Sequence, residues 1–359
     1  MQKERITDKQ ATHLLIIFYI GSTFIIGAGA GAKNDTWISV ILGVILATPM
    51  LFVYARLLAL FPEKGLFDIL ELVFGKIIGK CVAFLYIWYT FHLGALVIQN
   101  FGQYINTTTM PETPLLIPML CLGLVCIAAV RSGIEVIGRI SVYSLPLIFF
   151  IIFIVQIMGL PNWNLENVKP ILANGFLPVL KGGFSVFSFP FAESVVLLGA
   201  FFSLKTNHSA YKIFLKGTAI AGFFLLIITL RNIFILGGML PNLYFPSHVA
   251  VSRISIGHFL QRIEVTVAVV LIFGVFIKAS ICLLVSSMGI AKVFKLHDYR
   301  SVVIQTGLLM VYFSYTLYDS IFEMRAWAFE IYSYYAFPFQ VILPLVMLGI
   351  GELKRLKGS

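Results

Sequence analysis

Charged residues are scarce in this 359-residue chain. They make up 12% of it, whereas hydrophobic residues make up 59%. A soluble domain needs roughly a quarter of its residues charged to cover its surface, so a soluble protein is excluded. Disordered, collagen-like and coiled-coil chains are excluded by the same composition. The sequence therefore predicts an all-α polytopic membrane protein that forms a single transmembrane domain over residues 1–359.

Cysteines and catalytic motifs are also scarce. The four cysteines lie in or beside apolar segments, with no CxxC pair and no cysteine–histidine pairing: Cys81, Cys121, Cys126 and Cys282. We interpret them as small core residues rather than a disulfide or metal framework. The sequence contains no nucleophile elbow, P-loop, HExxH motif or carboxylate pair at catalytic spacing. We therefore expect no catalytic residue, no metal, no cofactor and no enzymatic activity.

Long apolar runs, by contrast, are abundant. A hydrocarbon core of about 30 Å needs about 20 apolar residues per helix. This length predicts ten transmembrane helices, near 11–31, 36–60, 78–105, 114–131, 138–160, 182–202, 213–240, 263–291, 301–319 and 333–352. The lipid bilayer is thus the main environment of the chain.

The basic residues, which give the chain a net charge of +10, are distributed unevenly across the predicted membrane. Of the 26 basic residues, 18 fall on one side of the predicted membrane and 6 on the other. Because basic residues collect in cytoplasmic loops, this bias predicts that both termini are cytoplasmic. It also removes the need for a nucleic-acid partner, which the same charge would suggest in a soluble protein.

Two of the predicted spans carry helix-breaking residues. The first reads GSTFIIGAGAGA, and the sixth has Pro190 near its middle with Ser185, Ser188 and Glu193 around it. These spans hold equivalent places in a five-plus-five division and would cross in opposite directions. This predicts a five-plus-five inverted repeat of the LeuT/APC-like type, with broken helices 1 and 6. The alternative for the glycines is close helix packing.

The repeat boundaries follow from the spans. The first repeat covers about 11–160, the second about 182–319, and the last helix about 333–352. A small-molecule site is expected at the midplane, where the ends of the half-helices offer free N–H groups and partial positive charge to a carboxylate. The candidate ligand-binding residues are Gly27, Ala28, Gly29, Phe187, Ser188, Phe189 and Pro190.

Few ionisable groups fall at membrane depth. Glu193, Arg231 and Lys278 lie inside the sixth, seventh and eighth predicted spans. Buried charges in a membrane are costly unless they are paired or face water. One interpretation is a structural ion pair of Glu193 with Arg231 or Lys278. The other is a coupling or ion-path role for the three residues.

Other polar features have simpler interpretations. His92 and Gln99 lie close to one helix face, and His92 is expected to hydrogen-bond a neighbouring helix rather than bind a ligand. Glu135 and Arg139 form an i,i+4 pair. The loops 161–181 and 241–262 mix apolar and polar residues at helical spacing, as interfacial helices do. The last loop, which carries Asp319, Glu323, Arg325 and Glu330, is expected to be a solvated turn.

Three stretches of the sequence form recognisable patterns. Phe189–Glu193 reads FPFAE, and Arg231-Asn232 is followed by Leu236-Gly237. The stretch from Phe245-Pro246-Ser247-His248 continues through Arg253, Ile256, Phe259, Arg262 and Glu264. These stretches resemble the FPFGE, RN…LG and YPSY…R…I…F…RxE patterns of the B-subunit permeases of endospore germinant receptors. That family lies within the amino acid–polyamine–organocation transporter superfamily, and the resemblance covers essentially the whole chain.

The resemblance implies a ten-helix bundle in the inner membrane of a spore. It implies partnership with a receptor A subunit and a lipoprotein C subunit, and the sensing of a small-molecule germinant such as an amino acid. Two residues depart from the family pattern, Ala192 in place of glycine and His248 in place of an aromatic residue. The methyl group of Ala192 lies beside the helix break, so it bears on which ligand is bound.

Two rival functions remain at this point. The chain is a germinant-sensing receptor subunit, or it is a free-standing amino acid transporter coupled to protons or sodium through the same site. A third possibility is a structural scaffold that recruits partners through its loops and binds nothing.

Overall fold

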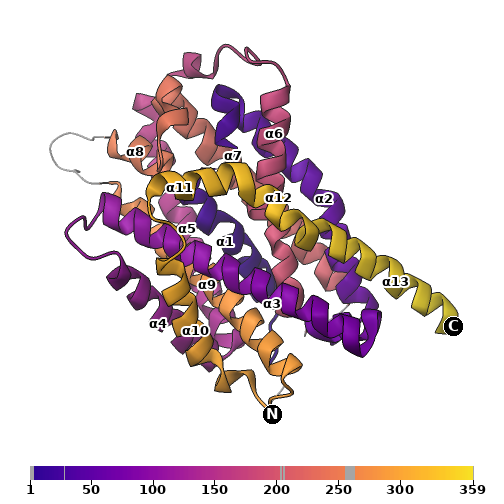
Figure 1. Cartoon of the computed structure of the whole chain (residues 1–359). Coiled ribbons are helices and arrows are strands. Elements are labelled where there is room, and N and C mark those ends of the chain that lie inside the picture. Colours follow the sequence, from indigo (N-terminus) through magenta and orange to yellow (C-terminus); the bar gives the residue numbers. More distant parts are fainter. Residues whose placement is uncertain (1–3, 28, 203, 205–206, 255–262, 359) are drawn as a thin grey trace.

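The structure is a computed structural model, described for residues 4–358 except 28, 203, 205–206 and 255–262. Within these residues the regular structure is entirely helical (Figure 1). The helices are α1 (Asp8–Ile26), α2 (Thr36–Leu60), α3 (Leu66–Thr108), α4 (Leu116–Ser132), α5 (Ile134–Gly159), α6 (Leu177–Val186), α7 (Asn207–Leu236), α8 (Pro246–Ser252), α9 (Val265–Val293), α10 (Val303–Tyr315), α11 (Ile321–Ala326), α12 (Tyr332–Phe337) and α13 (Leu343–Gly358).

Short 3₁₀ or π-helical turns join several of these helices. They are η1 (Ala30–Asp35), η2 (Leu160–Asn162), η3 (Leu165–Val168), η4 (Phe187–Phe191), η5 (Ala192–Gly199), η6 (Gly237–Asn242), η7 (Tyr299–Ser301), η8 (Trp327–Ile331) and η9 (Pro338–Ile342). The π-helical turns are η4, η8 and η9. Turns of this kind often mark functional positions in helices.

The helices have the length and composition of membrane spans. In the described part of the chain, seven helical segments are long and apolar enough to cross a bilayer, and Leu116–Ser132 and Val303–Tyr315 are shorter apolar helices. This confirms a multi-pass membrane protein. The count of ten spans stays a prediction.

A short helical segment precedes the third predicted span. This span is expected to start at 78, and α3 is kinked just before that point, at Gly75, where φ is +80° and ψ −179°. The segment before the kink buries Leu66, Phe67 and Leu70. A Cβ on Gly79 would lie 2.8 Å from the Leu70 carbonyl oxygen, so this segment packs back against the start of the span.

The loops also differ from expectation. The 161–181 segment holds part of η2, η3 and the first residues of α6, and Pro170 and Gly175 lie between η3 and α6. In 241–262 the structure shows η6 and the seven-residue α8, while Ile256, Phe259 and Arg262 lie outside the described residues. The predicted solvated turn near 319–330 is instead largely helical, as α11 and η8.

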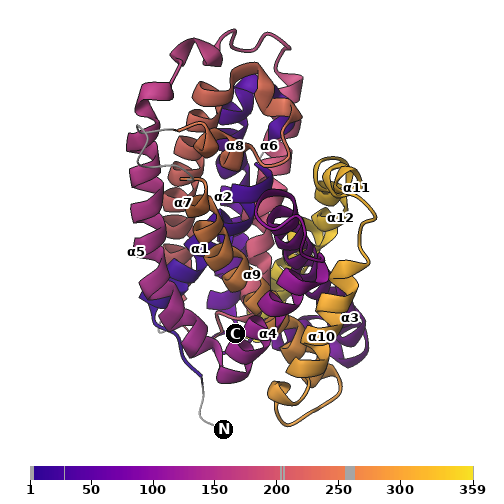
Figure 2. The ribbon, with the colours of Figure 1, turned by 90° about the vertical axis from the view of Figure 1, so that its left-hand side faces the viewer.

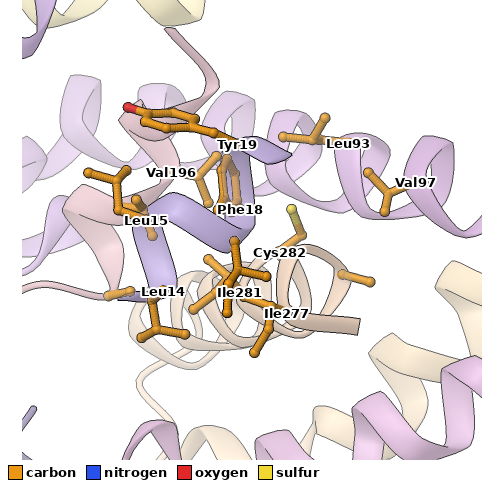
Figure 3. Packing of buried hydrophobic residues seen from close by; sticks show 14 of the residues in the cluster. Leu14, Leu15, Phe18, Tyr19, Leu93, Val97, Val196, Ile277, Ile281 and Cys282 are labelled. Carbon is orange, nitrogen blue, oxygen red and sulfur yellow. The ribbon is translucent and has the colours of Figure 1, made fainter. Parts of the chain in front are cut away.

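The centre of the bundle is formed by α1. Every side chain from Leu14 to Ile20 is buried, so this stretch is apolar on all sides, as a fully enclosed helix should be. In Figure 3, Leu14 and Phe18 of α1 lie against Ile277 and Ile281 of α9. The central packing thus fixes α1 to α9.

The two helices touch at a pair of glycines. A Cβ atom on Gly21 of α1 would lie 2.2 Å from the Cα of Gly274 of α9, and a Cβ on Gly274 would lie 2.0 Å from the Cα of Gly21. The two backbones are therefore in direct contact. No larger residue fits at this crossing without moving one of the helices.

Both predicted helix breaks are confirmed. Helix α1 stops where Gly27 adopts φ +72°, and Gly29 then adopts φ +72° in the left-handed region. The second break lies in η4, where Phe189 leaves helical geometry with φ −129° and ψ 111° and Pro190 lacks a donor N–H. A Cβ on Gly29 would lie 3.1 Å from Val186 Cγ2, so the two broken segments lie side by side.

Candidate ligand site

A small cavity lies where the two broken helices meet. Its volume is about 30 Å³, which is room for about two water molecules. The lining residues are Gly27, Leu93, Leu96, Val97, Asn100, Ser185, Phe189, Glu193, Tyr318, Trp327, Ala328, Phe329 and Tyr332. The cavity therefore joins α1, α3, the broken sixth span and the helical segment around η8.

The polar end of the cavity is built on Glu193. Its carboxylate accepts a hydrogen bond from Lys278 Nζ at Oε2 and another from the Tyr332 hydroxyl at Oε1. Glu193 and Lys278 have no solvent-exposed side-chain surface. A buried charge pair is tolerated when each charge is compensated by its partner and by further hydrogen bonds, as here.

The ammonium group of Lys278 is also held between two aromatic rings. Its Nζ lies 4.9 Å from the ring centre of Phe18 on α1 and 4.8 Å from that of Phe189 in η4. Cation–π contacts of this length stabilise a desolvated ammonium. The Lys278 side chain therefore ties α9 to both broken helices.

A second polar group, the side chain of Gln340, holds the helix break in η4. Gln340 of η9 is fully buried and donates from Nε2 to the Ser188 carbonyl at 2.9 Å and to the Tyr89 hydroxyl at 3.0 Å. Ser188 Oγ donates to Gln340 Oε1 at 2.9 Å. The Tyr89 and Tyr332 hydroxyls are 3.4 Å apart. A continuous polar chain thus runs from Ser188 through Gln340 and the two tyrosines to Glu193.

The remaining walls are largely aromatic. The π-helical turn η8 supplies Trp327, Ala328 and Phe329 to the cavity. A groove of about 510 Å³ between α6 and α12 shares Ser185 and Phe329 with the cavity. Phe329 of η8 therefore lies between the cavity and this larger groove.

Two of the predicted ligand-binding residues, Gly27 and Phe189, line the cavity. Ala28 lies outside the described residues. Gly29 and Phe187 pack against neighbouring helices instead, with Gly29 close to Ser39 and Phe187 stacked near Phe184. Ser188 faces Gln340, and Pro190 is buried in the break.

The three predicted ionisable residues separate into two places. Of the two predicted ion pairs of Glu193, the structure contains the pair with Lys278. Arg231 is fully buried on α7 and donates from Nε and Nη2 to Asn232 Oδ1, while Asn232 donates to Ser247 of α8. In the described chain Arg231 shows no ion pair and its Nη1 has no partner.

The expected hydrogen bond from His92 to a neighbouring helix is not formed at Nδ1 in the described structure. His92 Nδ1 and both side-chain polar atoms of Gln99 have no hydrogen-bond partner there, although both residues are buried. His92 instead stacks on Trp88 at 5.4 Å. The Glu135–Arg139 pair is present at 3.6 Å between exposed side chains.

Several site residues were not singled out in the sequence. Trp327, Tyr332 and Gln340 come from the aromatic-rich last segment, whose helical pattern is hard to separate from a turn. The signal available was a polar glutamine in an apolar run, together with a tyrosine that needs a hydrogen-bond partner when it is buried.

Comparison with protein families gives a match over most of the chain. A family model described as "Spore germination protein" matches residues 5–320. Spore germination protein KB of Bacillus subtilis (strain 168) is 29% identical over 99% of this chain and 96% of the relative. Spore germination protein YndE of the same organism is 25% identical over 81% of this chain and 82% of the relative.

Solved structures show the same fold in transporters. Mhp1, a nucleobase-cation-symport-1 family transporter in a closed conformation with bromovinylhydantoin bound, matches with a TM-score of 0.70 at 12% identity, over 94% of this chain and 77% of that one. A Na⁺-coupled sialic acid symporter in a substrate-bound outward-open state matches with a TM-score of 0.66 at 12% identity, over 90% and 76%. The LeuT-like fold expected from the sequence is thereby confirmed.

Proposed function

The chain belongs to the spore germination protein family of permeases, and from this premise we propose that it is the nutrient-sensing membrane subunit of a germination receptor. The observation that carries the proposal is a cavity lined by residues of both helix breaks, Gly27 and Phe189, and by the buried carboxylate of Glu193. In transporter folds, interrupted helices at midplane depth form the binding site for small solutes.

The ligand proposed is small and carries its own polar groups. Asn100 and Ser185 offer hydrogen bonds at the cavity wall, and the free carbonyl groups at the C-terminal end of α1, before Gly27, suit an ammonium group. Because Lys278 already neutralises Glu193, the site gives a ligand no unpaired protein charge from that pair. An amino acid, whose charges compensate each other, fits these conditions.

Ligand binding must enlarge the cavity. A volume of about 30 Å³ is far below what an amino acid occupies. The wall formed by η8 separates the cavity from the larger groove, so displacement of η8 would admit a ligand from the groove. Tyr332 follows η8 directly and donates to Glu193, so such a movement would displace the Glu193–Lys278 pair. Because Lys278 belongs to α9 and contacts Phe18 of α1, ligand binding would be coupled to both helices.

The receptor context is part of the proposal. We place the chain in the spore inner membrane with both termini in the cytoplasm, next to a receptor A subunit and a lipoprotein C subunit. The inverted repeats are proposed at about 11–160 and 182–319, with the last helix near 333–352. The coupling residues proposed within this frame are Glu193 and Lys278, with Arg231 acting from α7.

Filling the cavity tests the site. Ala328 lines the cavity on η8, whereas Ala326 is exposed two positions earlier. We expect Ala328→Leu to abolish the nutrient response of spores that carry it, because the added atoms exceed the free volume. Ala326→Leu, which adds the same atoms outside the cavity, should respond normally. Optical density of spore suspensions across a nutrient concentration series measures both.

The amount of each variant in spore membranes is measured by immunoblotting, so that a folding defect is separated from a binding defect. An Ala328→Leu variant that is present at normal level and keeps an unchanged concentration dependence would exclude this cavity as the nutrient site.

A second candidate function is transport by the chain alone. It is favoured by the likeness to symporters, which use this fold to carry solutes. Purified chain reconstituted in liposomes and supplied with labelled amino acids separates the two. Accumulation that depends on a proton or sodium gradient supports transport, whereas ligand-induced stabilisation without uptake supports sensing.

A further inference from the structure

A second cavity opens between α1, α5 and α7, away from the ligand site. Its volume is about 320 Å³, and it shares no lining residue with the ligand cavity. Three lysines line it: Lys9 of α1 and Lys212 and Lys216 of α7. The other lining residues are Asp8, Thr12 and His13 and the apolar residues Ile16, Leu145, Phe149, Ile213 and Ile220.

Most of the apolar lining residues lie further along the helices than the lysines. The N-terminal ends of α1, α5 and α7 lie together, because Ser141 of α5 donates to the Gln10 carbonyl at 3.5 Å and Ser209 of α7 donates to Asp8 at 2.8 Å. These ends lie at the end of the molecule where the chain begins (Figure 2). The lysines stand near this end, with Ile213 between Lys212 and Lys216, and Ile16, Leu145, Phe149 and Ile220 lie further along their helices.

The lysines carry charge that the protein does not neutralise. In the described chain none of Lys9, Lys212 and Lys216 forms an ion pair, and all three are exposed. The single carboxylate among the lining residues is Asp8, and one of its oxygens accepts the Ser209 hydrogen bond. The mouth of the cavity is therefore net positive, and the N-terminal ends of the helices add to the potential.

The far end of the cavity is suited to hydrocarbon. Ile16 is buried, and the Phe149 ring stacks on Phe224 of α7 with the ring centres 4.0 Å apart, which closes α5 against α7. An occupant must therefore combine an anionic head with an apolar tail. A free phosphate satisfies the lysines but leaves the apolar end unfilled.

We propose that this cavity binds an anionic phospholipid, with the phosphate of the headgroup on Lys9, Lys212 and Lys216 and an acyl chain along Ile213 and Ile220. Basic cavities between membrane helices at one bilayer surface are suited to such headgroups. Lysines also collect on one side of a membrane protein when they bind no lipid. Here, however, the lysines open onto a cavity with apolar walls, and those walls favour a lipid-binding site.

The position of the cavity gives the lipid a role. Helix α1 forms one wall through Lys9 and Ile16 and reaches the ligand cavity at Gly27. A bound lipid holds the first half of α1 against α5 and α7, so it biases the arrangement of the broken helix at the ligand site.

The test uses the purified full chain in a neutral detergent. Phosphatidylglycerol, phosphatidylcholine and inorganic phosphate are titrated separately, and the melting temperature and the lipid bound in native mass spectrometry are recorded. The double variant Lys212→Gln/Lys216→Gln is compared with Lys76→Gln/Lys80→Gln, which removes two exposed lysines from α3 that do not line this cavity. Lys212→Arg/Lys216→Arg keeps the charge.

We expect phosphatidylglycerol to stabilise the wild type, the α3 control and the arginine variant. The Lys212→Gln/Lys216→Gln variant should bind it about thirtyfold more weakly, from the usual contribution of each lysine near an anionic surface. Equal responses of all variants overturn the site. A response to inorganic phosphate as large as that to the lipid overturns the lipid assignment in favour of a free anion. If the double glutamine variant does not fold, the single glutamine variants answer the same question.

Discussion

Ser188 and Gln340 hydrogen-bond to each other in both directions across the helix break. The serine hydroxyl donates to the glutamine carbonyl oxygen at 2.9 Å, and the glutamine amide donates to the serine backbone carbonyl at 2.9 Å. The pair joins η4 to η9, two π-helical turns that are far apart in the sequence. Backbone groups released by a broken helix must be satisfied inside the membrane, and Gln340 satisfies one of them.

Removing either member of this pair should destabilise the bundle. Ser188→Ala and Gln340→Met each leave a buried polar group unpaired, which costs about 1–3 kcal/mol. The double variant should lose less than the sum of the two, because the two residues share their bonds. Melting temperatures of the four proteins in detergent measure the coupling.

Ser286→Ala is the matched control for this cycle. Ser286 is equally buried, but its hydroxyl donates only to carbonyls of its own helix, at Cys282 and Leu283. Strict additivity of Ser188→Ala and Gln340→Met would show that the reciprocal pair does not act as a unit.

Breaking the buried ion pair should be more costly. Lys278→Met leaves the Glu193 carboxylate unpaired in a site with no exposed surface, and the loss of one partner of a buried pair costs about 3–5 kcal/mol. Adding Glu193→Gln to Lys278→Met removes the stranded charge and should recover part of the loss. The yield of folded protein by size-exclusion chromatography and the melting temperature both report the effect.

The helix crossing at Gly21 and Gly274 should tolerate no methyl group. Gly274→Ala places a Cβ 2.0 Å from the Cα of Gly21, far inside van der Waals contact, so α1 and α9 must separate. We expect a strongly reduced melting temperature or no folded protein. Gly349→Ala in α13 meets no neighbour within 4 Å and should be neutral or stabilising by up to about 1 kcal/mol. Similar behaviour of the two variants would contradict the backbone contact.

Acidification should weaken the docking of α8. Burial lowers the pKa of His248 below 6.5, against the carboxylate of Glu264, which raises it. Its Nδ1 lies 3.0 Å from the Tyr104 hydroxyl. Because the folded pKa is below the unfolded value, the stability that His248 contributes is present above pH about 6.5 and is lost as the pH falls through the folded pKa. Melting temperatures between pH 7.5 and 5 should fall less for His248→Gln than for the wild type.

The helix breaks were predictable because glycine and proline act on the backbone locally. Gly27 and Gly29 adopt positive φ, and Pro190 removes a donor, whatever surrounds them. The choice between Arg231 and Lys278 as the partner of Glu193 was not predictable in the same way. The partner is Lys278 because α9, rather than α7, places its charged residue against Glu193 of η5. That arrangement is set by tertiary packing.

The last segment was the least predictable part of the site. Trp327–Ile331 forms a π-helical turn without a glycine or proline to mark it. Apart from Glu330 its side chains are apolar or aromatic, so hydropathy does not distinguish the cavity wall from the lipid-facing surface. Tyr332 belongs to the site through its place in the cavity wall and its hydrogen bond to Glu193, and both depend on tertiary packing.

The pairing of Glu193 with Lys278 has an electrical consequence. A charge that crosses a membrane field does work of about 2.3 kcal/mol per 100 mV, but two opposite charges that move together do almost none. The pair carries no net charge, and its members are joined by a direct contact. Rearrangement of the broken helices around this pair therefore costs the same in a polarised membrane as in one whose voltage has collapsed.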